Sequence, residues 1–299
     1  MMAETKQKKE APKKKPDNNN KPVSKKKKKS KLWLWVIIIL FVWWFNNFTL
    51  RVNDSEITSS KVKSTIRLAV ISDLHATKHG IKNKTIFDAV DKEHPDAVFF
   101  LGDMYTRQSE WELIQKPVDL AEMLTSAGYP LYCVTGEHDY DDRYVSELEK
   151  TGAKVLSYEE DTIEVRGSRL HIMGIDNVYY SPTFDLNNAF SLDDGSFNIL
   201  LAHIPNYEKF ADFGAELTLC GDTHGEMARL PFGLGPVYCS EKKVWFPKLL
   251  HKELDIYDKG CFSYDGGRMF ITSGIGAYPA PVRMCNRPEI AVIEVKPKG

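Results

Sequence analysis

From Ile66 onwards, short apolar runs alternate with amphipathic segments, and this alternation restricts the fold more than any other feature of the sequence. Runs with the length and apolar content of buried strands lie at 66–71, 97–101 and 130–135. Segments with helical periodicity lie between or after them, at 83–93, 117–127 and 142–150. Because alternating strands and helices form crossover units with largely parallel strands, this half is predicted to be α/β.

The second half of the chain has a different pattern. Residues 162–165 and 169–174 are predicted to form a hairpin across Arg166–Ser168. Further strands are expected at 197–202, 216–220, 268–273 and 290–295. No internal repeat of fixed period is visible. We therefore predict an α/β fold, a layered α/β/β/α sandwich of two mixed sheets, rather than a barrel.

A stretch of 19 residues without a charge, Leu32–Leu50, precedes this region. As a helix it would reach ~28 Å, close to the thickness of the hydrocarbon core of a bilayer. Tryptophans lie near both ends of the stretch, at 33, 35, 43 and 44. We predict one transmembrane helix over 32–50, used as a signal anchor. A cleaved signal peptide is the alternative, but no small-residue cleavage pattern follows the apolar run.

The overall net charge of −1 conceals two parts of opposite sign. Residues 1–31 contain 13 Lys and three acids, a balance of +10, so the rest of the chain carries −11. We predict a disordered cytoplasmic tail over 1–31, attracted to anionic lipid headgroups rather than to nucleic acid. The Lys excess before the helix predicts that the N-terminus lies in the cytoplasm. The chain would then be a single-pass protein of the cell membrane, with a linker at 51–65 and an extracytoplasmic domain at 66–299.

Polar residues that carry chemistry follow the predicted strands directly. They occur in five segments, Ser72–His75, Gly102–Asp103, Gly136–Asp139, Ala202–His203 and Gly221–Glu226. In open α/β sheets, ligand sites form at the carboxyl ends of strands. One such segment alone would be weak evidence, but their joint order, with glycines that permit tight turns, predicts one site.

These segments resemble the calcineurin-like metallophosphoesterase superfamily, whose pattern is DxH, GD, GNH(D/E), a lone His and GHxH. The resemblance covers residues 66–296. The C-terminal segments 274–276, 281–283 and 286–290 resemble bacterial membrane-associated phosphodiesterases related to UDP-2,3-diacylglucosamine pyrophosphatase. The resemblance implies two divalent metal ions and hydrolysis of a phosphate ester or anhydride.

The resemblance also assigns metal ligands, in two sets that share Asp103. The first metal would be held by Asp73, His75, Asp103 and His224. The second would take Asp103, His203, Glu137 and Asp222, where Glu137 and Asp222 replace the Asn and His that the family usually has. Carboxylate and imidazole ligands suit Mn²⁺, Fe, Zn²⁺ or Mg²⁺. Because two carboxylates favour harder ions, Mn²⁺ is expected, and the second site is predicted to prefer Mn²⁺ or Mg²⁺ over Zn²⁺.

Other residues receive roles around the metals. Two ions that share a water lower its pKa and orient the phosphoryl group. His138, which matches a family position beside the metals, is expected to donate a proton to the leaving oxygen or to stabilise its developing charge. Asp139 could orient that imidazole, but we predict instead that it caps the helix at 143–150. Arg283 and Arg287 are candidates for binding substrate phosphate, although Arg287 could equally form a structural ion pair with Glu289.

The predicted function is a metal-dependent phosphoesterase that hydrolyses a phosphodiester or pyrophosphate in an extracytoplasmic, envelope-related substrate. That substrate would be a phosphorylated small molecule or a lipid-linked phosphate. One alternative is a metal-binding envelope module whose catalysis is weak or lost because of Glu137 and Asp222. Another is a phosphomonoesterase or protein phosphatase, which would use the same site chemistry.

Overall fold

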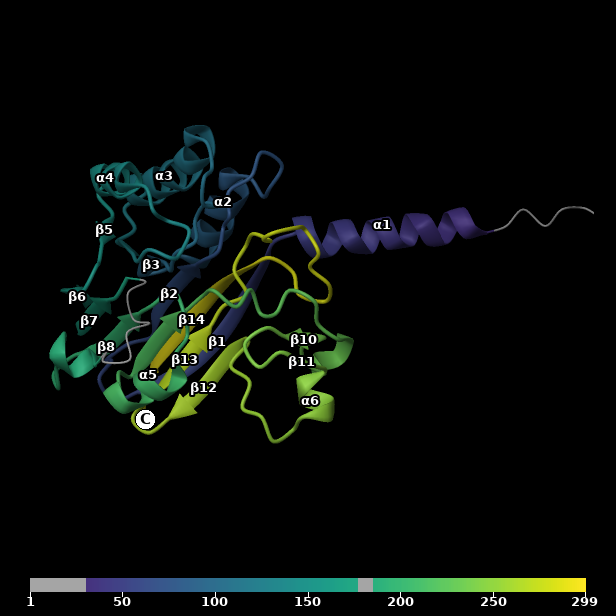
Figure 1. Cartoon of the computed structure of the whole chain (residues 1–299). Coiled ribbons are helices and arrows are strands. Elements are labelled where there is room, and N and C mark those ends of the chain that lie inside the picture. Colours follow the sequence, from purple (N-terminus) through teal and green to yellow (C-terminus); the bar gives the residue numbers. More distant parts are fainter. Residues whose placement is uncertain (1–30, 177–184) are drawn as a thin grey trace, which may run out of the picture.

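The computed structural model describes residues 31–176 and 185–299. It contains two six-stranded sheets packed face to face, with helices on their outer faces (Figure 1). The predicted α/β/β/α sandwich of two mixed sheets is therefore confirmed. Apart from Lys31, the predicted disordered tail lies outside the described residues.

The first sheet is mostly parallel. Its strand order is β1 (Arg51–Ser59), β14 (Glu289–Pro297), β2 (Ile66–Ile71), β3 (Ala97–Phe100), β4 (Leu131–Cys133) and β5 (Lys154–Val155). Only the pairing of β14 with β2 is antiparallel. Three helices cover its outer face, namely α2 (Asn83–Glu93), α3 (Trp111–Ser126) and α4 (Asp142–Lys150).

The second sheet has a parallel centre and two antiparallel edges. Its order is β12 (Gly260–Tyr264), β13 (Gly267–Ile271), β9 (Leu217–Cys220), β8 (Phe197–Leu201), β7 (Ser168–Gly174) and β6 (Glu159–Val165). Hairpins β12–β13 and β6–β7 form the edges. Its outer face is covered by α5 (Tyr207–Phe213) and the 3₁₀ helix η1 (Leu186–Asn188).

The main core lies between the two sheets. Leu68 and Phe99 from the first sheet pack in one cluster with Ile172, Ile199 and Leu219 from the second. All five side chains are fully buried, so the burial of each contributes about 1.5 to 3 kcal/mol to the stability of the fold. This packing fixes the carboxyl ends of the strands of both sheets relative to one another.

A smaller lobe follows β9. It contains the 3₁₀ helix η2 (Pro231–Gly233), strands β10 (Tyr238–Cys239) and β11 (Val244–Trp245), and helix α6 (Pro247–Leu250). β10 and β11 form a separate two-stranded sheet. In Figure 1 this lobe lies on the same side of the sandwich as the base of the N-terminal helix α1 (Leu32–Phe48).

The segment 51–65 is not the linker that we predicted. Its residues 51–59 form strand β1, which pairs in parallel with β14 over nine residue pairs, Arg51↔Glu289 to Ser59↔Pro297. Ile57 is buried and joins the core between the sheets. The prediction was wrong because polar residues alternate with few apolar ones in an edge strand, so the strand resembles a loop in sequence.

The uncharged run near the N-terminus also differs from its prediction. Helix α1 has 17 residues and ends at Phe48, because Thr49 adopts an extended conformation that leads into β1. Within 31–176 and 185–299, no helix combines the length and the apolar character required to cross a membrane. The predicted transmembrane helix over 32–50 is therefore not found.

Helix α3 begins at Trp111, six residues before the predicted start at Pro117. In the structure Pro117 lies inside the helix, where it removes one backbone hydrogen bond. Burial of Ile114, Val118 and Leu120 against the first sheet offsets this cost.

Candidate metal centre

The predicted ligands converge at the carboxyl ends of strands from both sheets. Asp73 and His75 follow β2, and Asp103 follows β3. His203 follows β8, and His224 follows β9. Backbone hydrogen bonds continue the strand pairing into these loops, since Asp73 N donates to Gly102 O (3.0 Å) and Gly221 N donates to His203 O (2.8 Å). The two sheets therefore build one site together.

Five of the seven predicted ligands have a left-handed backbone. Their φ angles are positive, at 49° for Asp73, 38° for His75, 53° for Asp103, 64° for Asp222 and 49° for His224. For residues other than glycine this conformation is uncommon and costs of order 1–3 kcal/mol each. Such strain concentrates at functional sites, where the surrounding structure holds it in place.

Neighbouring glycines let the ligand loops approach each other closely. A Cβ atom on Gly136 would lie 2.3 Å from Asp103 Oδ1, and one on Gly221 would lie 2.7 Å from Asp73 Oδ2. Neither position has room for a side chain. The glycines in the sequence motifs therefore serve the packing of the loops around the carboxylates.

The ligand atoms form three overlapping groups, each within 4.8 Å of one another. The groups are Asp73, His75 and His224; His75, Asp103 and His138; and Asp73, Asp103 and His203. Asp103 belongs to two of them, as the predicted bridging carboxylate would. The structure thus brings together all four ligands predicted for the first metal.

Two buried atoms of this centre, Asp73 Oδ2 and His203 Nε2, have no hydrogen-bond partner among the described residues. His203 Nδ1 donates to Leu101 O (2.7 Å), so Nε2 faces the centre. Burial alone would lower the pKa of His203, but Asp103 and the other carboxylates hold it well above its ordinary value, so a metal at Nε2 would take the place of a proton. Burial raises the pKa of Asp73 to about 7. Because a buried carboxylate without a partner is unfavourable, a bound cation fits this set of donors.

His75 and His224 face each other through their Nε2 atoms, which lie 3.2 Å apart. Burial lowers the pKa of His75 to about 4 and also holds the pKa of His224 well below its ordinary value. Both rings are therefore neutral at pH 7. Two neutral imidazoles with converging nitrogens are typical metal ligands.

Asp103 is an anion in this centre. Although burial alone would raise its pKa, the charge of the neighbouring His203 lowers the pKa of Asp103 to about 2. Its Oδ2 atom lies 3.3 Å from His203 Nε2 and 3.7 Å from His75 Nε2. A carboxylate that stays ionised between two imidazoles is suited to hold two cations.

Glu137 and Asp222 lie at the rim of the centre. The side chain of Glu137 is 47% exposed, and its Oε1 is 3.9 Å from His138 Nε2. Asp222 Oδ1 is 3.8 Å from His203 Nε2. Neither residue belongs to the three close groups found among the described residues. Their predicted place at the second metal stays a prediction.

His138 is oriented by the backbone. Its N–H donates to Asp103 Oδ1 (2.9 Å), and its ring Nδ1 accepts a hydrogen bond from Arg107 N (2.9 Å). In the neutral imidazole the proton therefore lies on Nε2, which is 3.9 Å from Asp103 Oδ2. The ring therefore presents an N–H group beside the ligands, and the predicted role of His138 stays a prediction.

Asp139 does not cap helix α4, in contrast to our prediction. The cap is Asp141, whose side chain accepts from Arg143 N (2.9 Å). Asp139 is buried, and its carboxylate accepts from Met104 N (3.1 Å) and Gly136 N (3.0 Å). It therefore ties the loop after β3 to the loop after β4, a contact between distant segments that sequence spacing does not reveal.

The two predicted substrate arginines have other contacts. Arg283 is 2% exposed and donates to Ser273 O (2.6 Å) and Gly276 O (2.5 Å), while its Nη2 lies 3.4 Å from His224 Nδ1. It lies behind a ligand and supports the surrounding loop. Burial lowers its pKa to about 10, which still leaves it charged.

Arg287 lies at the base of α1. Its guanidinium donates to Thr49 Oγ1 (2.9 Å) and Leu50 O (2.8 Å) and lies 4.5 Å from the centre of the Phe45 ring. The expected alternative, an ion pair with Glu289, is not formed, because Glu289 pairs with Lys259 (2.5 Å). Both arginines are thus engaged by other parts of the protein, and their predicted contact with substrate stays a prediction.

Two residues of the site were missed by the sequence reasoning. Tyr278 packs with its ring parallel to His75 (centroids 5.1 Å apart) and edge-on to His138 (4.8 Å). Asn286 donates to His224 O (2.7 Å) and so fixes the backbone of a ligand. Both lie in the C-terminal loop, far in sequence from the ligands, and only its similarity to the membrane-associated phosphodiesterases drew attention to this segment.

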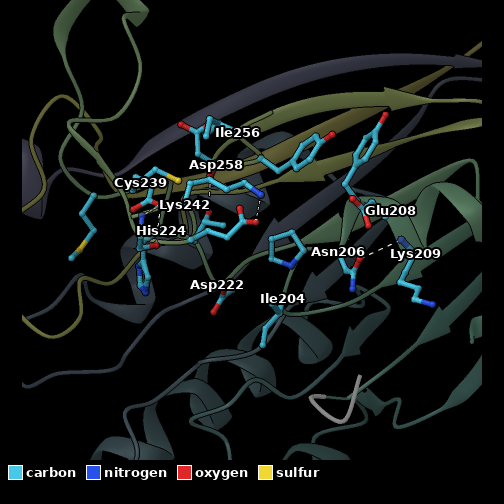
Figure 2. A pocket seen from close by; sticks show the side chains of 18 of the residues that line it. Ile204, Asn206, Glu208, Lys209, Asp222, His224, Cys239, Lys242, Ile256 and Asp258 are labelled. Atoms are coloured by element: carbon cyan, nitrogen blue, oxygen red, sulfur yellow. Dashed lines mark hydrogen bonds and ion pairs between the residues drawn. The ribbon is translucent and has the colours of Figure 1, made fainter. Parts of the chain in front are cut away.

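A pocket of about 930 Å³ opens beside the metal centre. Figure 2 shows Asp222 and His224 toward one end of it and Asn206 and Lys209 toward the other. Tyr278 also lines the pocket, so it adjoins the ligands directly. Its walls mix apolar side chains, such as Ile204 and Ile256, with charged ones. Such a pocket can hold the part of a substrate that does not react.

Comparisons with known proteins give a consistent picture. An uncharacterized metallophosphoesterase, YkuE, of Bacillus subtilis (strain 168) is 25% identical over 258 residues, 81% of this chain and 85% of the relative. An uncharacterized metallophosphoesterase of Aquifex aeolicus (strain VF5) is 26% identical, over 84% of this chain and 94% of its own. A "transmembrane protein with metallophosphoesterase domain" of Danio rerio is 26% identical, over 82% of this chain and 57% of its own.

The model of one protein family, described as calcineurin-like phosphoesterase, matches residues 66–231. That range contains every predicted metal ligand and His138, and the homologous chains are themselves named metallophosphoesterases. The match covers more than half of the sequence. With its sandwich fold and its cluster of aspartates and histidines, this chain belongs to the calcineurin-like phosphoesterase family and is a metal-dependent phosphoesterase.

Proposed function

We propose that this phosphoesterase hydrolyses a phosphodiester or pyrophosphate bond and that the Nε2–H group of His138 donates a hydrogen bond to the leaving oxygen and so stabilises its developing charge. The observation that carries the proposal is the position of His138 Nε2, which holds a proton 3.9 Å from the carboxylate shared by two ligand groups. A leaving group that departs as an alkoxide or phosphate gains from a donor at that point. We propose no role in substrate binding for Arg283 or Arg287.

The other residues of the centre position the reacting groups and neutralise charge. Metal ions held by the ligand groups would supply Lewis-acid activation of a water and stabilisation of charge on the phosphoryl oxygens. Asp103 holds its charge between the histidines, so it would keep the two ions together. Asp73 and the neutral rings of His75 and His224 would supply the other ligands of one ion. Tyr278 packs against His75 and His138 and limits the rotation of both rings.

Asp103→Asn tests this proposal. The change removes the anionic charge from the shared ligand, so metal-dependent hydrolysis of bis(p-nitrophenyl) phosphate by the full chain should fall at least ~100-fold. Asp88→Asn is the matched control, because Asp88 lies exposed on α2 and pairs only with Lys84 (2.8 Å) among the described residues. Its activity should equal that of the unmodified protein.

Two outcomes separate the alternatives. Equal, metal-independent rates in the unmodified protein and Asp103→Asn would contradict the proposal and favour a metal-binding module without catalysis. Faster hydrolysis of p-nitrophenyl phosphate than of the diester would favour a phosphomonoesterase or protein phosphatase. A panel of monoesters, diesters and nucleotide-sugar pyrophosphates then defines the bond that is cleaved.

We propose a lipid-linked or otherwise envelope-related phosphate as substrate, within the group related to UDP-2,3-diacylglucosamine pyrophosphatase. The pocket beside the metals supports this proposal, because it offers apolar walls from Ile204, Ile256 and Tyr257 next to the ligand His224. The resemblance of the C-terminal loop supports the same class. Competition of diacylated against deacylated phosphates for hydrolysis would check it, and equal inhibition by both would contradict it.

We also propose that α1 attaches the protein to the cell membrane, with the catalytic domain on the extracytoplasmic side. The large side chains of α1 from Leu32 to Phe45 are 39–66% exposed, although nearly all are apolar. The name of the Danio rerio relative, a transmembrane protein, supports the proposal. Resistance of the chain to carbonate extraction, and digestion of its domain by protease added outside intact cells, are expected. Release into the soluble fraction would contradict attachment.

A further inference from the structure

The 11 residues Lys242–Lys252 combine the types of side chain that are typical of a segment at a membrane surface. It contains four lysines and no acidic residue, together with Val244, Trp245, Phe246, Leu249 and Leu250. Trp245 is 60% exposed and Leu250 is 67% exposed. Aromatic rings and lysines are enriched where proteins meet lipid headgroups, because each combines an apolar body with a polar tip.

This segment is held by the fold. Trp245 pairs with Tyr238 across the β10–β11 ladder, and their rings are 5.1 Å apart. Phe246 N donates to Val237 O (2.8 Å), and α6 follows immediately. The exposed apolar side chains are therefore presented by a fixed hairpin and helix, so their exposure is not the result of a disordered loop.

A neighbouring turn extends the same surface. The turn 230–235 presents Phe232, which is 98% exposed, and Leu234. A Cβ atom on Gly235 would lie 2.7 Å from the Lys248 side chain, so the turn lies directly against α6. Isolated exposed apolar residues are ordinary, but adjacent ones with aromatic rings mark an interaction surface.

Hydrogen bonds connect this surface to the base of α1. Val237 N donates to Ala228 O, and Arg229 N donates to Met284 O (both 2.9 Å). The loop that contains Met284 meets α1, where Trp43 Nε1 donates to Pro281 O (2.8 Å). Figure 1 shows β10, β11 and α6 on the side of the sandwich from which α1 extends. The apolar surfaces of α1 and of this lobe are thus joined through one continuous set of contacts.

We propose that Phe232, Leu234 and residues 242–252 form a membrane-docking surface that binds a bilayer with anionic headgroups. Lys242 and Lys248 pair with Glu241 and Asp258. The charges of Lys243 and Lys252 select this occupant, since both are exposed in the same segment as Trp245 and Leu250 and complement anionic lipid. Lys243 and Lys252 make no ion pair or hydrogen bond within the described ranges 31–176 and 185–299, so both are free to meet phosphate headgroups. The proposal rests on attachment through α1 and requires no catalysis.

Docking would also orient the catalytic pocket. Cys239, Ser240 and Lys242 line the pocket beside the metals, and Lys242 is at the same time the first residue of the docking segment. The pocket wall and the lipid-facing segment therefore belong to one hairpin. A substrate that resides in the bilayer would reach the pocket without crossing bulk water.

Hydrogen–deuterium exchange tests this surface. The full chain is placed at one copy per nanodisc, in zwitterionic lipid or in lipid that contains 30% phosphatidylserine. Amides of residues 244–252 should exchange at least tenfold more slowly in the anionic nanodiscs, whereas peptides of α4, which Figure 1 shows on the side of the domain away from α1 and this lobe, should exchange equally in both.

Charge reversals supply the matched comparison. The double variant Lys243→Glu with Lys252→Glu should lose this protection, while Lys92→Glu with Lys298→Glu, at exposed positions outside the lobe, should retain it. Equal exchange in both lipids, or protection that survives the first double variant, would overturn the proposal. Protection that appears only with two copies per nanodisc would assign the surface to self-association and overturn it as well. Hydrolysis of bis(p-nitrophenyl) phosphate, measured in parallel, reports on the proposed function separately.

Discussion

At the scale of single residues, the two oxygens of Asp103 have different tasks. Oδ1 accepts from His138 N (2.9 Å), which fixes the carboxylate in the loop after β3. Oδ2 faces the imidazole nitrogens of His203, His75 and His138 at 3.3, 3.7 and 3.9 Å. One oxygen therefore positions the group and the other is available to cations, so small displacements of this residue should have large effects.

Gly136→Ala should displace Asp103 without changing any ligand. The new Cβ would lie 2.3 Å from Oδ1 and 2.6 Å from the backbone N of Asp103, so the loop must shift. Because misplacement by about 1 Å can cost ~100-fold in rate, kcat/KM for the diester should fall by that order. Gly195→Ala is the control, since it meets only Asp193 Oδ1, at 3.3 Å, and should keep full activity.

Glu137 and Asp222 offer a test of metal preference. Changing both toward the family pattern, as Glu137→Asn with Asp222→His, removes two carboxylates from the rim and adds an imidazole. The ratio of bound Zn²⁺ to Mn²⁺, measured by mass spectrometry after equilibration with both ions, should rise in the double variant. An unchanged ratio would show that the rim residues do not select the second ion.

At the scale of secondary-structure elements, β1 closes the first sheet. Strand β14 lies between β1 and β2 and would become an edge strand if β1 were absent. Nine backbone pairs and the burial of Ile57 would be lost at once. An unpaired apolar edge is also a template for aggregation.

A chain that begins at Ile66 should therefore fail to fold, although the ligands and the family match all lie after that residue. A chain that begins at Leu50 retains β1 and should be monodisperse. Size-exclusion chromatography and circular dichroism of the two would distinguish them. Equal folding of both would show that β1 contributes little to the domain.

Much of the element order could be predicted because buried strands and amphipathic helices have distinct periods. Strand β2 and helices α2 and α4 begin and end where the pattern indicated. Strands β1 and β12 were missed, because each lies at a sheet edge and mixes polar with apolar residues. A half-exposed edge strand carries little periodic signal.

The residues of the candidate metal clusters could be predicted because their motifs are short and local. The partners that hold them could not, because they come from elsewhere in the chain. Asp139 binds Met104 N across 35 residues, and Asn286 binds His224 O across 62. Arg283 was assigned to substrate from its charge alone, whereas its burial behind His224 depends on the path of the C-terminal loop.

At the scale of the whole molecule, the metal centre links the two sheets. Asp73, His75 and Asp103 follow strands of the first sheet, and His203 and His224 follow strands of the second. Ions held between them would connect the sheets at one end of the sandwich. Metal binding should therefore stabilise the fold as a whole as well as the site.

Addition of Mn²⁺ to metal-stripped protein should raise the melting temperature. At a metal concentration of about 100 times Kd, the gain is ~2.7 kcal/mol, or roughly 5 to 10 °C for a domain of this size. Asp73→Asn weakens one buried ligand and should abolish most of the shift. An equal shift in this variant, measured by differential scanning fluorimetry, would place the ions elsewhere.

Only Thr49 and Leu50 separate α1 from β1, and β1 is locked to β14 along its length. The domain therefore has no long flexible linker between β1 and α1. A catalytic domain on a long flexible tether samples a broad hemisphere, whereas this domain, if α1 attaches it to a membrane as we propose, would be held at one height and one tilt. Its choice of substrate would then be geometric as well as chemical, because only a phosphate presented at that height can reach the ligands.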